Sequence, residues 1–385
     1  MKIGDRIKVV IGGIAHGGHC VARHEGRVIF VRHAIPGEEV IVEVTDVTSK
    51  FARGDAIEIL QSSPDRVSSQ CKYSKPGGCG GCDFQHVSLQ RQRELKSEVI
   101  REQFARVAKM DVEIFVEEVL PTEHWRTRMD FTVSDNRKLA LYGSRSHHLV
   151  EIDSCFIADQ TFDLAEINAR KLPIGSKVHV AVGSDKRLEI EIDGRESRAL
   201  LEQEVGKRKY SLSPTSFWQS HRAAPHLLTS VVKEFLAPRK GDHIFDLYGG
   251  VGLFTGSLID DVGAGGRITL IENDELATTD ARRNFAANDN IEVVKEKVER
   301  ALDRFTRADI VVADPPRAGL GAKVCSLIVD LAPRSIVYVS CDPSSLARDA
   351  RTLVDSGYEM DQIRAFDLFP MTQHVECVAR FIKRG

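Results

Sequence analysis

Short apolar runs, each ended by glycine or by polar residues, fill the first sixty positions of the chain. The runs lie at 6–11, 19–23, 27–32, 38–44 and 56–60. Glycine pairs and Pro36-Gly37 stand between them, as expected for turns between strands. Five short strands in this length predict a small all-β domain over residues 1–60, of the oligonucleotide-binding barrel type. Basic residues such as Arg23 and Arg53 suit a phosphate backbone or ordinary solvated surface, so the pattern leaves RNA binding and a structural barrel open.

The period of the apolar residues changes to that of a helix between positions 88 and 110. One stripe contains Leu95, Val99, Ile100, Phe104 and Val107. The other side, which we interpret as a solvated basic face, contains Arg91, Arg93, Lys96, Arg101 and Arg106. Strand-like runs follow at 130–134, 139–143, 177–182 and 187–192, with a helical run at 160–171. The pattern predicts a central α+β domain over residues 61–210, and the 88–110 helix is a candidate to pack on the next domain.

Residues 211–385 alternate strands and helices in the way that builds a doubly wound parallel sheet of the Rossmann-like α/β class. Apolar runs typical of strands buried on both faces lie at 244–245, 268–272, 310–313 and 336–339. Polar segments follow three of these strands, at 246–252, 314–317 and 340–343. The carboxyl ends of parallel strands meet at one edge, where ligands of such sheets bind. We therefore expect these three segments to form one site.

The glycine-rich segment 246–252 indicates a nucleotide-like ligand, because glycines allow a ligand to approach the N-terminus of the next helix. Glu272 ends the next strand, about twenty residues on, where an acid commonly binds ribose hydroxyls. No lysine followed by Ser or Thr stands nearby to hold a triphosphate. The sequence therefore favours a nucleoside cofactor without a triphosphate, with S-adenosylmethionine as the leading case.

Cys341 is the candidate nucleophile, because it stands on the short turn between a strand and a helix. Ser344-Ser345 is the expected N-cap of that helix, and a helix N-terminus is expected to lower the pKa of the thiol. The alternative is a half-buried, inert cysteine. Glu376 is expected at the start of the final strand, with Cys377 on the opposite face. It is either a solvated edge residue or a base beside the Cys341 turn.

The chain of 385 residues is long enough for two or three domains with buried cores. It contains no apolar run that could span a membrane, and its first residues lack the apolar core of a secretion signal. These features predict a soluble cytoplasmic protein without a membrane partner. The formal net charge of −3 does not by itself indicate a nucleic-acid partner.

Three of the eight cysteines, Cys71, Cys79 and Cys82, lie within twelve residues and have glycines around them. A reducing compartment argues against disulfides, whereas such crowding is typical of a metal or cluster site. Cys155 is the candidate fourth ligand. We rank an iron–sulfur cluster first, a zinc ion, which also accepts four cysteines, second, and a chance clustering third.

Taken together, these motifs resemble those of the RNA uracil-5-methyltransferases, in particular rRNA-modifying members with an N-terminal TRAM domain and an iron–sulfur cluster. Residues 1–60 are similar to TRAM, and the four cysteines are similar to the cluster ligands. The segments 217–219 (Phe-Trp-Gln), 314–317 (Asp-Pro-Pro-Arg), 340–343 (Ser-Cys-Asp-Pro) and 374–376 (His-Val-Glu) match family motifs in family order. The resemblance extends over almost the whole chain.

The resemblance implies roles for these residues. Cys341 would add to carbon 6 of uracil, which makes carbon 5 nucleophilic, and Glu376 would remove the proton from carbon 5. The donor S-adenosylmethionine would be bound by Gln219, Tyr248, Gly250, Glu272 and Asp314. A [4Fe–4S] cluster would be held by Cys71, Cys79, Cys82 and Cys155. The expected substrate is a uridine of 23S rRNA and the expected state is a monomer.

Two alternatives to this function stay open: methylation of a uridine in the T-loop of tRNA, and a non-catalytic RNA-binding protein with a methyltransferase-like fold. An amino-group methyltransferase fits less well, because such enzymes need no cysteine nucleophile. The chain also departs from the family pattern at two places. Seven residues separate Cys71 from Cys79, where five are expected, and His221 stands where asparagine is usual.

Overall fold

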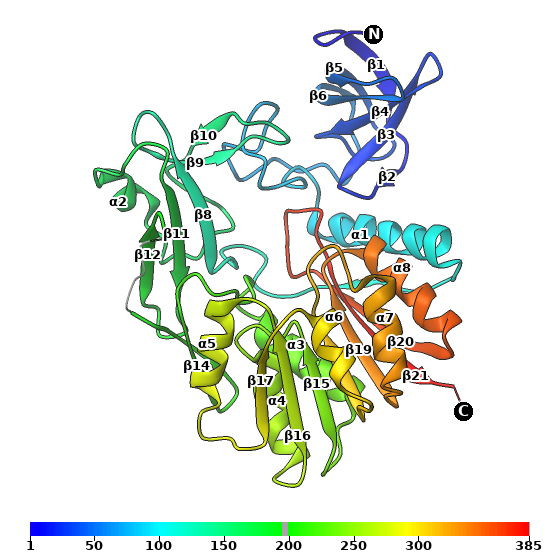
Figure 1. The fold of residues 1–385 in the computed structure, drawn as a ribbon. Coiled ribbons are helices and arrows are strands. Elements are labelled where there is room, and N and C mark those ends of the chain that lie inside the picture. The colour runs from blue at the N-terminus through cyan, green and yellow to red at the C-terminus, as the bar shows by residue number, and fades with distance from the viewer. Residues whose placement is uncertain (195–198, 385) are drawn as a thin grey trace.

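The N-terminal part of the computed structural model, which describes residues 1–194 and 199–384, is a six-stranded sheet (Figure 1). Its strands are β1 (Arg6–Val10), β2 (Ile14–Ala15), β3 (His19–His24), β4 (Arg27–Arg32), β5 (Glu39–Val47) and β6 (Phe51–Gln61), in the order β1-β5-β6-β4-β3-β2. The amide of Gly12 donates to the carbonyl of Val21 at 2.7 Å, so the chain that follows β1 reaches β3. The sheet thus curls around a core that includes Ile29 and Val40, and the predicted small β-domain is confirmed.

Part of this sheet differs from the strands predicted from the sequence. The prediction did not include the two-residue strand β2, and it started the last strand at residue 56, whereas β6 starts at Phe51. The first half of β6 pairs in parallel with β4, from Val28 with Phe51 to Arg32 with Asp55. This half contains Arg53-Gly54-Asp55, which has low intrinsic strand preference. Long-range pairing, which no local pattern reveals, makes it a strand.

The central part contains a five-stranded antiparallel sheet. Its strands are β8 (Arg128–Val133), β9 (Leu139–Tyr142), β10 (Leu149–Glu151), β11 (Lys177–Val182) and β12 (Leu188–Ile192), in the order β10-β9-β8-β11-β12. One helix, α2 (Leu164–Ala169), contributes Leu164 and Ile167 to the core under this sheet. It is shorter than the predicted 160–171 because Asp163 caps it, accepting the amide of Glu166 at 2.9 Å.

The helix predicted at 88–110 ends earlier as a regular α-helix. It comprises α1 (Leu89–Gln103), which starts after the N-cap Ser88, and a π-turn at Phe104–Ala108. A π-turn widens the helix and shifts the side chains that follow it, so Val107 is exposed although Phe104 is fully buried. The chain continues into β7 (Val116–Glu117), which pairs in parallel with a strand of the third part. In space this segment therefore packs against the third part (Figure 1).

The third part is built on a sheet with the order β17-β16-β15-β18-β19-β21-β20-β7. The strands are β15 (His243–Leu247), β16 (Arg267–Glu272), β17 (Ile291–Lys295), β18 (Ile310–Ala313), β19 (Ser335–Ser340), β20 (Tyr358–Phe366) and β21 (Glu376–Lys383). The helices are α3 (Ala224–Leu236), α4 (Leu253–Val262), α5 (Glu275–Asn284), α6 (Val298–Ala301), α7 (Gly321–Asp330) and α8 (Pro343–Asp355). β15 to β19 are parallel, and β21 runs antiparallel to both of its neighbours. This is the Rossmann-like α/β architecture that the sequence predicted.

Separate apolar cores cover the two faces of this sheet. Helices α3, α4 and α5 pack on one face, and α6, α7 and α8 pack on the other together with residues of α1. A hairpin of β13 (Leu201–Val205) and β14 (Arg208–Leu212) was not predicted from the sequence. It packs into the core under α3, α4 and α5 through Leu201, Tyr210 and Leu212. Every residue of β18 and β19 is buried, as expected for central parallel strands.

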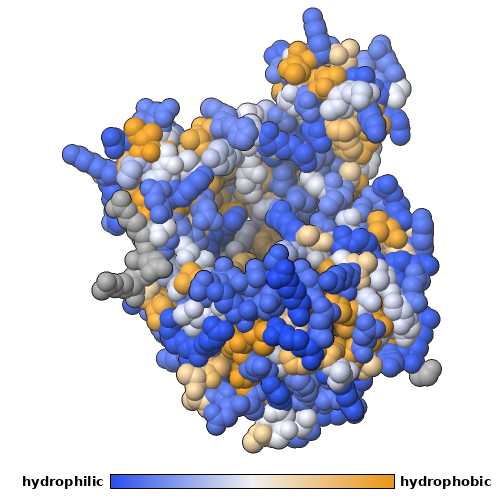
Figure 2. Space-filling model, viewed as in Figure 1, coloured by the Kyte–Doolittle hydropathy of each residue, from blue (hydrophilic) through white to orange (hydrophobic). Residues whose placement is uncertain are grey.

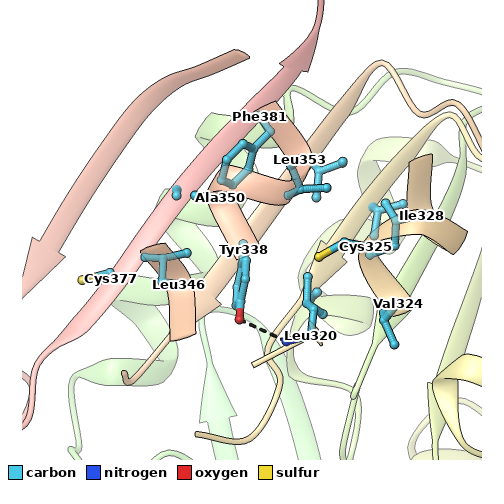
Figure 3. Close-up of a cluster of buried hydrophobic side chains, with 14 of the residues drawn as sticks. Leu320, Val324, Cys325, Ile328, Tyr338, Leu346, Ala350, Leu353, Cys377 and Phe381 are labelled. Carbon is cyan, nitrogen blue, oxygen red and sulfur yellow. Dashed lines mark hydrogen bonds between the residues drawn. The ribbon is translucent and has the colours of Figure 1, made fainter. Parts of the chain in front are cut away.

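The core under α7 and α8 fixes the strand that leads to Cys341 (Figure 3). The hydroxyl of Tyr338 on β19 accepts the amide of Leu320 at 3.3 Å and donates to the carboxylate of Asp349 at 3.0 Å. The N-cap of α8 differs from the prediction. It is Asp342, which accepts the amide of Ser345 at 2.8 Å, and Pro343 is the first helical residue. Only the N-cap residue Asp342 therefore stands between Cys341 and the first helical residue.

Within the described ranges, no helix combines the length and the apolar character that crossing a membrane requires.

Lys96 on α1 does not belong to a solvated face, as the sequence analysis had it. Its ammonium group donates to Asp367 at 2.6 Å and to the carbonyl of Phe369 at 3.1 Å. The two charged side chains are only 1% and 2% exposed, and burial lowers the pKa of Lys96. This ion pair ties α1 to the segment that precedes β21.

We expect the substitution Lys96→Met to destabilise the protein strongly, because it leaves the buried carboxylate of Asp367 without its partner. Breaking a buried pair from one side costs about 3–5 kcal/mol of the free energy of unfolding. Urea unfolding followed by circular dichroism measures this loss. The matched control is Arg106→Ala, which removes an exposed ion pair with Glu102 from the next turns of the same segment and should cost less than about 1 kcal/mol. Equal effects of the two substitutions would contradict the structural role of Lys96.

Candidate active site

A cavity of about 1040 Å³ lies at the carboxyl ends of the parallel strands, between the third part and the central part. In the space-filling view the surface is hollowed where the parts of the chain meet, and hydrophilic side chains surround the hollow (Figure 2). All seven residues that the sequence analysis assigned to catalysis or donor binding line this cavity: Gln219, Tyr248, Gly250, Glu272, Asp314, Cys341 and Glu376. The structure thus brings together residues that are up to 157 positions apart (219 to 376).

The glycine loop after β15 forms one wall of the cavity. Gly252 has φ +95°, and a Cβ atom at this residue would lie 2.2 Å from the ring of Phe285, so no other residue fits. At Gly250, by contrast, an added Cβ meets nothing within 4 Å, which leaves room for a ligand. Glu272 accepts the amide of Gly250 at 3.0 Å through one carboxylate oxygen. The loop and the end of β16 therefore form a single polar wall.

Asp246 belongs to the glycine segment, and its role was not predicted from the sequence. It is fully buried, and one carboxylate oxygen accepts both the amide and the hydroxyl of Thr255, at 2.9 and 2.7 Å. The other oxygen has no hydrogen-bond partner among the described residues. Burial raises the pKa of Asp246 to about 6. The side chain anchors the start of α4 and so fixes the glycine loop.

Gln219 and Asp314 contact each other in the lining of the cavity. The side-chain amide of Gln219 donates to Asp314 at 3.1 Å. Burial raises the pKa of Asp314 to about 7, and the nearby Asp246 acts in the same direction. Phe217, two residues before Gln219, lies at the same cavity and is 65% exposed. An aromatic side chain that is exposed beside a polar cavity offers a surface on which a base can stack.

The pairing of β19 with β21 places Cys341 next to Glu376. Ser340 lies opposite Cys377 in this antiparallel ladder, so the next pair of positions along the two chains is Cys341 and Glu376. Cys377 is fully buried in the core on the α8 side of the sheet, whereas Glu376 lines the cavity. The two candidate catalytic groups therefore come from neighbouring strands of one sheet.

The pKa values of Glu376 and of the Cys341 thiol are raised by their surroundings in the cavity. Burial holds the pKa of Glu376 well above its usual range, and Asp314 acts in the same direction. Burial raises the pKa of the Cys341 thiol to about 12, with Glu376 and Asp314 adding to the effect and Arg317 opposing it. The predicted lowering of this pKa is therefore wrong, because burial and the carboxyl groups outweigh the helix terminus.

Arg317 and His374 are further cavity residues, to which the sequence analysis gave no role beyond their motifs. The guanidinium of Arg317 donates to Nε2 of His374 at 3.1 Å. Burial and Arg317 together lower the pKa of His374 to about 3, so this imidazole is neutral at pH 7. Because Arg317 is exposed and has no carboxylate partner among the described residues, its charge is available to an anionic ligand.

His221, whose role the sequence left open, is a buried packing residue. Its ring stacks on Trp125 at 5.6 Å between centroids. Its Nε2 donates to the carbonyl of Pro121 at 3.0 Å, and its Nδ1 accepts the amide of Ala223 at 3.0 Å. Burial lowers its pKa to about 4. His221 therefore holds Trp125, which lines the cavity, against the start of α3.

The four candidate cluster cysteines, Cys71, Cys79, Cys82 and Cys155, line one separate cavity of about 220 Å³. This cavity shares Gly80, Gly81 and Arg126 with the larger one. All four are free thiols, and burial raises the pKa of Cys79, Cys82 and Cys155. In the part of the chain that the structure describes, no three His, Cys, Asp or Glu side chains are gathered closely enough to bind a single metal ion.

The side chains around this cavity have the chemistry that an iron–sulfur cluster needs. Four thiols around one cavity are the donor set of a cluster. The amide of Gln85, only 2% exposed, lines the same cavity, and neither of its polar atoms has a hydrogen-bond partner among the described residues. The donor set and this unpaired amide fit a cluster.

Two parts of the sequence match known families. Residues 163–384 match the tRNA (uracil-5-)-methyltransferase family, and residues 1–57 match the TRAM domain. An uncharacterized RNA methyltransferase of Streptomyces avermitilis is 41% identical over 424 aligned positions, which cover 98% of each chain. One of Bifidobacterium longum is 35% identical and covers 98% of this chain and 96% of its own.

A solved structure covers the whole architecture. The tRNA (uracil-54, C5)-methyltransferase of Pyrococcus abyssi, in complex with S-adenosyl-L-homocysteine, superposes with a TM-score of 0.75. It is 25% identical and covers 98% of this chain and 100% of its own. On the evidence of these matches, the chain belongs to the tRNA (uracil-5-)-methyltransferase family, the RNA uracil-5-methyltransferases, and carries an N-terminal TRAM domain.

Proposed function

We propose that this protein methylates carbon 5 of a uridine in 23S rRNA through a covalent adduct between Cys341 and carbon 6. Because the chain belongs to this family, it is an RNA uracil-5-methyltransferase that uses S-adenosylmethionine. The observation that carries the covalent mechanism is the position of Cys341 beside Glu376, across the β19–β21 ladder, in the cavity that Gln219 and Glu272 also line. A nucleophile, a base and a donor site in one cavity are what the reaction requires.

The proposed reaction begins with the Cys341 thiolate, which forms a bond to carbon 6 of uracil. The electron pair of the 5,6 double bond moves toward the O4 carbonyl, and carbon 5 becomes a nucleophile. The donor supplies an electrophilic methyl group on a sulfonium. Carbon 5 takes this methyl while the carbon–sulfur bond of the donor breaks. Glu376 then removes the proton from carbon 5, the double bond re-forms, and Cys341 leaves as a thiolate.

The buried carboxyl groups suit a cationic donor. A positive charge placed beside Asp314, Glu376 and Cys341 favours their ionised forms and so lowers the pKa values that burial raises. Glu272 would accept the ribose hydroxyls, and Gln219 and Asp314 would contact the rest of the donor. In this proposal the nucleophile and the base become competent when the sulfonium is bound. The same residues bind the donor and prepare the reaction.

The substrate class rests on different support. A TRAM domain combined with a cysteine cluster resembles the arrangement of rRNA-modifying members, which favours 23S rRNA. A uridine of tRNA is the second candidate, because the Pyrococcus abyssi enzyme, which matches this chain along its full length, is named a tRNA (uracil-54, C5)-methyltransferase. The target base would have to leave its stack to reach the cavity. Experiments on the mechanism therefore need both RNAs.

For the central part we propose a [4Fe–4S] cluster bound by Cys71, Cys79, Cys82 and Cys155. No step of the methylation needs electron transfer, so the cluster would act on structure. It would join the 71–82 loop to the segment that carries Cys155, and Gly80 and Gly81 would connect it to the wall of the active-site cavity. Supporting this proposal are the shared cavity and the unpaired Gln85 amide.

Glu376→Gln should arrest the reaction after methyl transfer, because the adduct cannot lose the proton on carbon 5. Turnover should fall at least about 100-fold, the lower range for loss of a general base. A covalent RNA–protein band carrying a radioactive methyl group should accumulate in denaturing electrophoresis. Cys341→Ala should give neither product nor adduct. Offering 23S rRNA and tRNA separately shows which RNA forms the band, and we expect it with 23S rRNA.

The control for this experiment is Cys325→Ala, a buried cysteine in the core of α7 that should keep the activity. RNA that contains 5-fluorouridine should trap the unsubstituted enzyme in the same way, since fluorine does not leave as a proton. A Glu376→Gln variant that turns over normally, or an adduct with Cys341→Ala, would show that the roles are wrongly assigned. A band with tRNA alone would overturn the rRNA assignment and keep the mechanism.

Binding of S-adenosylmethionine at pH 7 should release more protons than binding of S-adenosylhomocysteine. The first ligand has a cationic sulfur and lowers the raised pKa values of Asp314 and Glu376, whereas the second has a neutral sulfur. Calorimetry in two buffers with different ionisation enthalpies counts these protons. The difference should shrink in Asp314→Asn. If both ligands release equal numbers of protons, the buried carboxyl groups do not respond to the sulfonium.

Protein purified without oxygen should be brown and should contain iron, with broad visible absorption from a cluster bound by four thiolates. Replacing Cys155 by Ala should remove the colour and lower the stability, because the ligand set ties separate segments together. Cys20→Ala, which changes a buried cysteine of the N-terminal sheet, is the matched control and should stay brown. A colourless protein with one zinc ion per chain would refute the cluster.

A further inference from the structure

The turn between β2 and β3 leaves the TRAM domain and contacts the methyltransferase domain at its catalytic motifs. Nε2 of His16 lies 2.9 Å from Oδ2 of Asp342, the residue after Cys341. Gly18 has φ +77°, and a Cβ atom there would lie 2.5 Å from Cβ of Gln373, three residues before Glu376. One three-residue turn of the TRAM domain therefore contacts both the nucleophile motif and the segment that leads to the base.

The two carboxylate oxygens of Asp342 make different contacts. Oδ1 accepts the amide of Ser345 and caps α8 at 2.8 Å, while Oδ2 faces His16. The amide of Asp342 donates to the hydroxyl of Ser340 at 3.3 Å, which closes the turn around Cys341. Asp342 raises the pKa of His16, and His16 lowers that of Asp342, as in an ion pair. The orientation of this carboxylate, and with it the turn of Cys341, thus depends on a residue of another domain.

A second contact runs beside the first. Asp83 accepts the amide of Gln373 at 3.2 Å and the guanidinium of Arg32, on β4 of the TRAM domain, at 3.4 Å. The side-chain amide of Gln373 lies 3.0 Å from Nδ1 of His374. A small cavity of about 120 Å³ lies between these contacts, and both His16 and Cys341 line it. The candidate nucleophile therefore stands between the large cavity and a small polar one that the TRAM turn helps to enclose.

We propose that the TRAM domain is part of the catalytic centre, and that His16 is a positioning residue that holds the Cys341–Asp342 turn in the geometry for attack. This inference rests on the proposed function. A domain that served only to hold RNA would act on RNA affinity alone. In the arrangement seen here, loss of the His16 contact frees the cap of α8 and the turn beside it, so it acts on the rate of adduct formation after RNA is bound.

The test compares His16→Ala with His16→Gln in the full-length protein, under single-turnover conditions with saturating 5-fluorouridine RNA and S-adenosylmethionine. We expect His16→Ala to form the covalent complex about ten-fold more slowly, which corresponds to about 1.4 kcal/mol of transition-state stabilisation. RNA affinity should change by less than about two-fold. His16→Gln keeps a side-chain N–H for Asp342 and should recover most of the rate. Gly18→Ala, which disturbs the second contact of the same turn, should also slow the step.

The matched control is His24→Ala, which removes a half-buried histidine at the end of β3 in the same domain. It should leave the rate of adduct formation unchanged. Hydrogen exchange of the free protein gives a readout that does not need RNA. The amide of Ser345 should exchange faster in His16→Ala than in the unsubstituted protein or in His24→Ala, because its acceptor loses its anchor.

Three outcomes overturn the inference. The first is an adduct rate in His16→Ala equal to that of the unsubstituted protein. The second is a defect that appears only as weaker RNA binding and vanishes at saturating RNA. The third is a rate of hydrogen exchange at the Ser345 amide that is the same in His16→Ala as in the unsubstituted protein. These results are distinct from a failure of the proposed function, in which the unsubstituted protein itself forms no adduct with either RNA.

Discussion

The antiparallel insertion of β21 between β19 and β20 is the constraint on which the catalytic arrangement depends. A purely parallel sheet would end every strand at this edge with a loop to a helix, and only one catalytic side chain would come from each strand end. Here β21 starts at the edge where β19 ends, so Glu376 begins its strand beside the turn of Cys341. The short distance between the two groups follows from backbone pairing and does not require a long loop to be ordered.

This constraint has an electrostatic consequence. Asp246, Asp314 and Glu376 all carry a raised pKa in the folded protein. The folded state thus binds more protons than the unfolded state between the normal pKa of a carboxyl group and the raised values. Its stability therefore falls as pH rises through that interval, to which Asp314 contributes up to about pH 7. A cationic ligand acts in the opposite direction, because it stabilises the ionised groups. The fold thus keeps three carboxyl groups in surroundings that favour their neutral forms.

The sequence could predict those features that local patterns determine. Strands β18 and β19 are apolar on both faces and were identified, and the segments 246–252, 314–317 and 340–343 were expected at one edge because parallel strands end there. Features that arise from long-range contacts could not be predicted. Lys96 follows the helical period of its exposed neighbours, and only the partner Asp367, 271 residues away, reveals its burial. Likewise the first half of β6 becomes a strand through β4.

The pKa of Cys341 illustrates a second limit of prediction from the sequence. The sequence correctly placed a cysteine before a helix, but the sign of its pKa shift depends on what else lies in the cavity. Burial of the thiol raises its pKa most, and two carboxyl groups from other strands add to the effect; both the burial and the proximity of these groups are properties of the fold. The N-cap shows the same: Asp342, rather than the serines, caps α8, because Pro343 suits the first helical position. Local rules thus identify the residues of a site more reliably than they predict its electrostatics.

The order of the chain gives the TRAM turn its place in this site. The segment 89–117 runs from the TRAM domain and the cysteine loop to the edge strand β7, and Lys96 and Gln92 fix it to the segment 367–371 that precedes β21. The N-terminal domain is thereby held at the same edge of the sheet as the two catalytic motifs. His16 reaches Asp342 from there. Our proposal that a contact of one hydrogen bond orients the candidate nucleophile depends on such a packed connection and would not hold for a flexible linker.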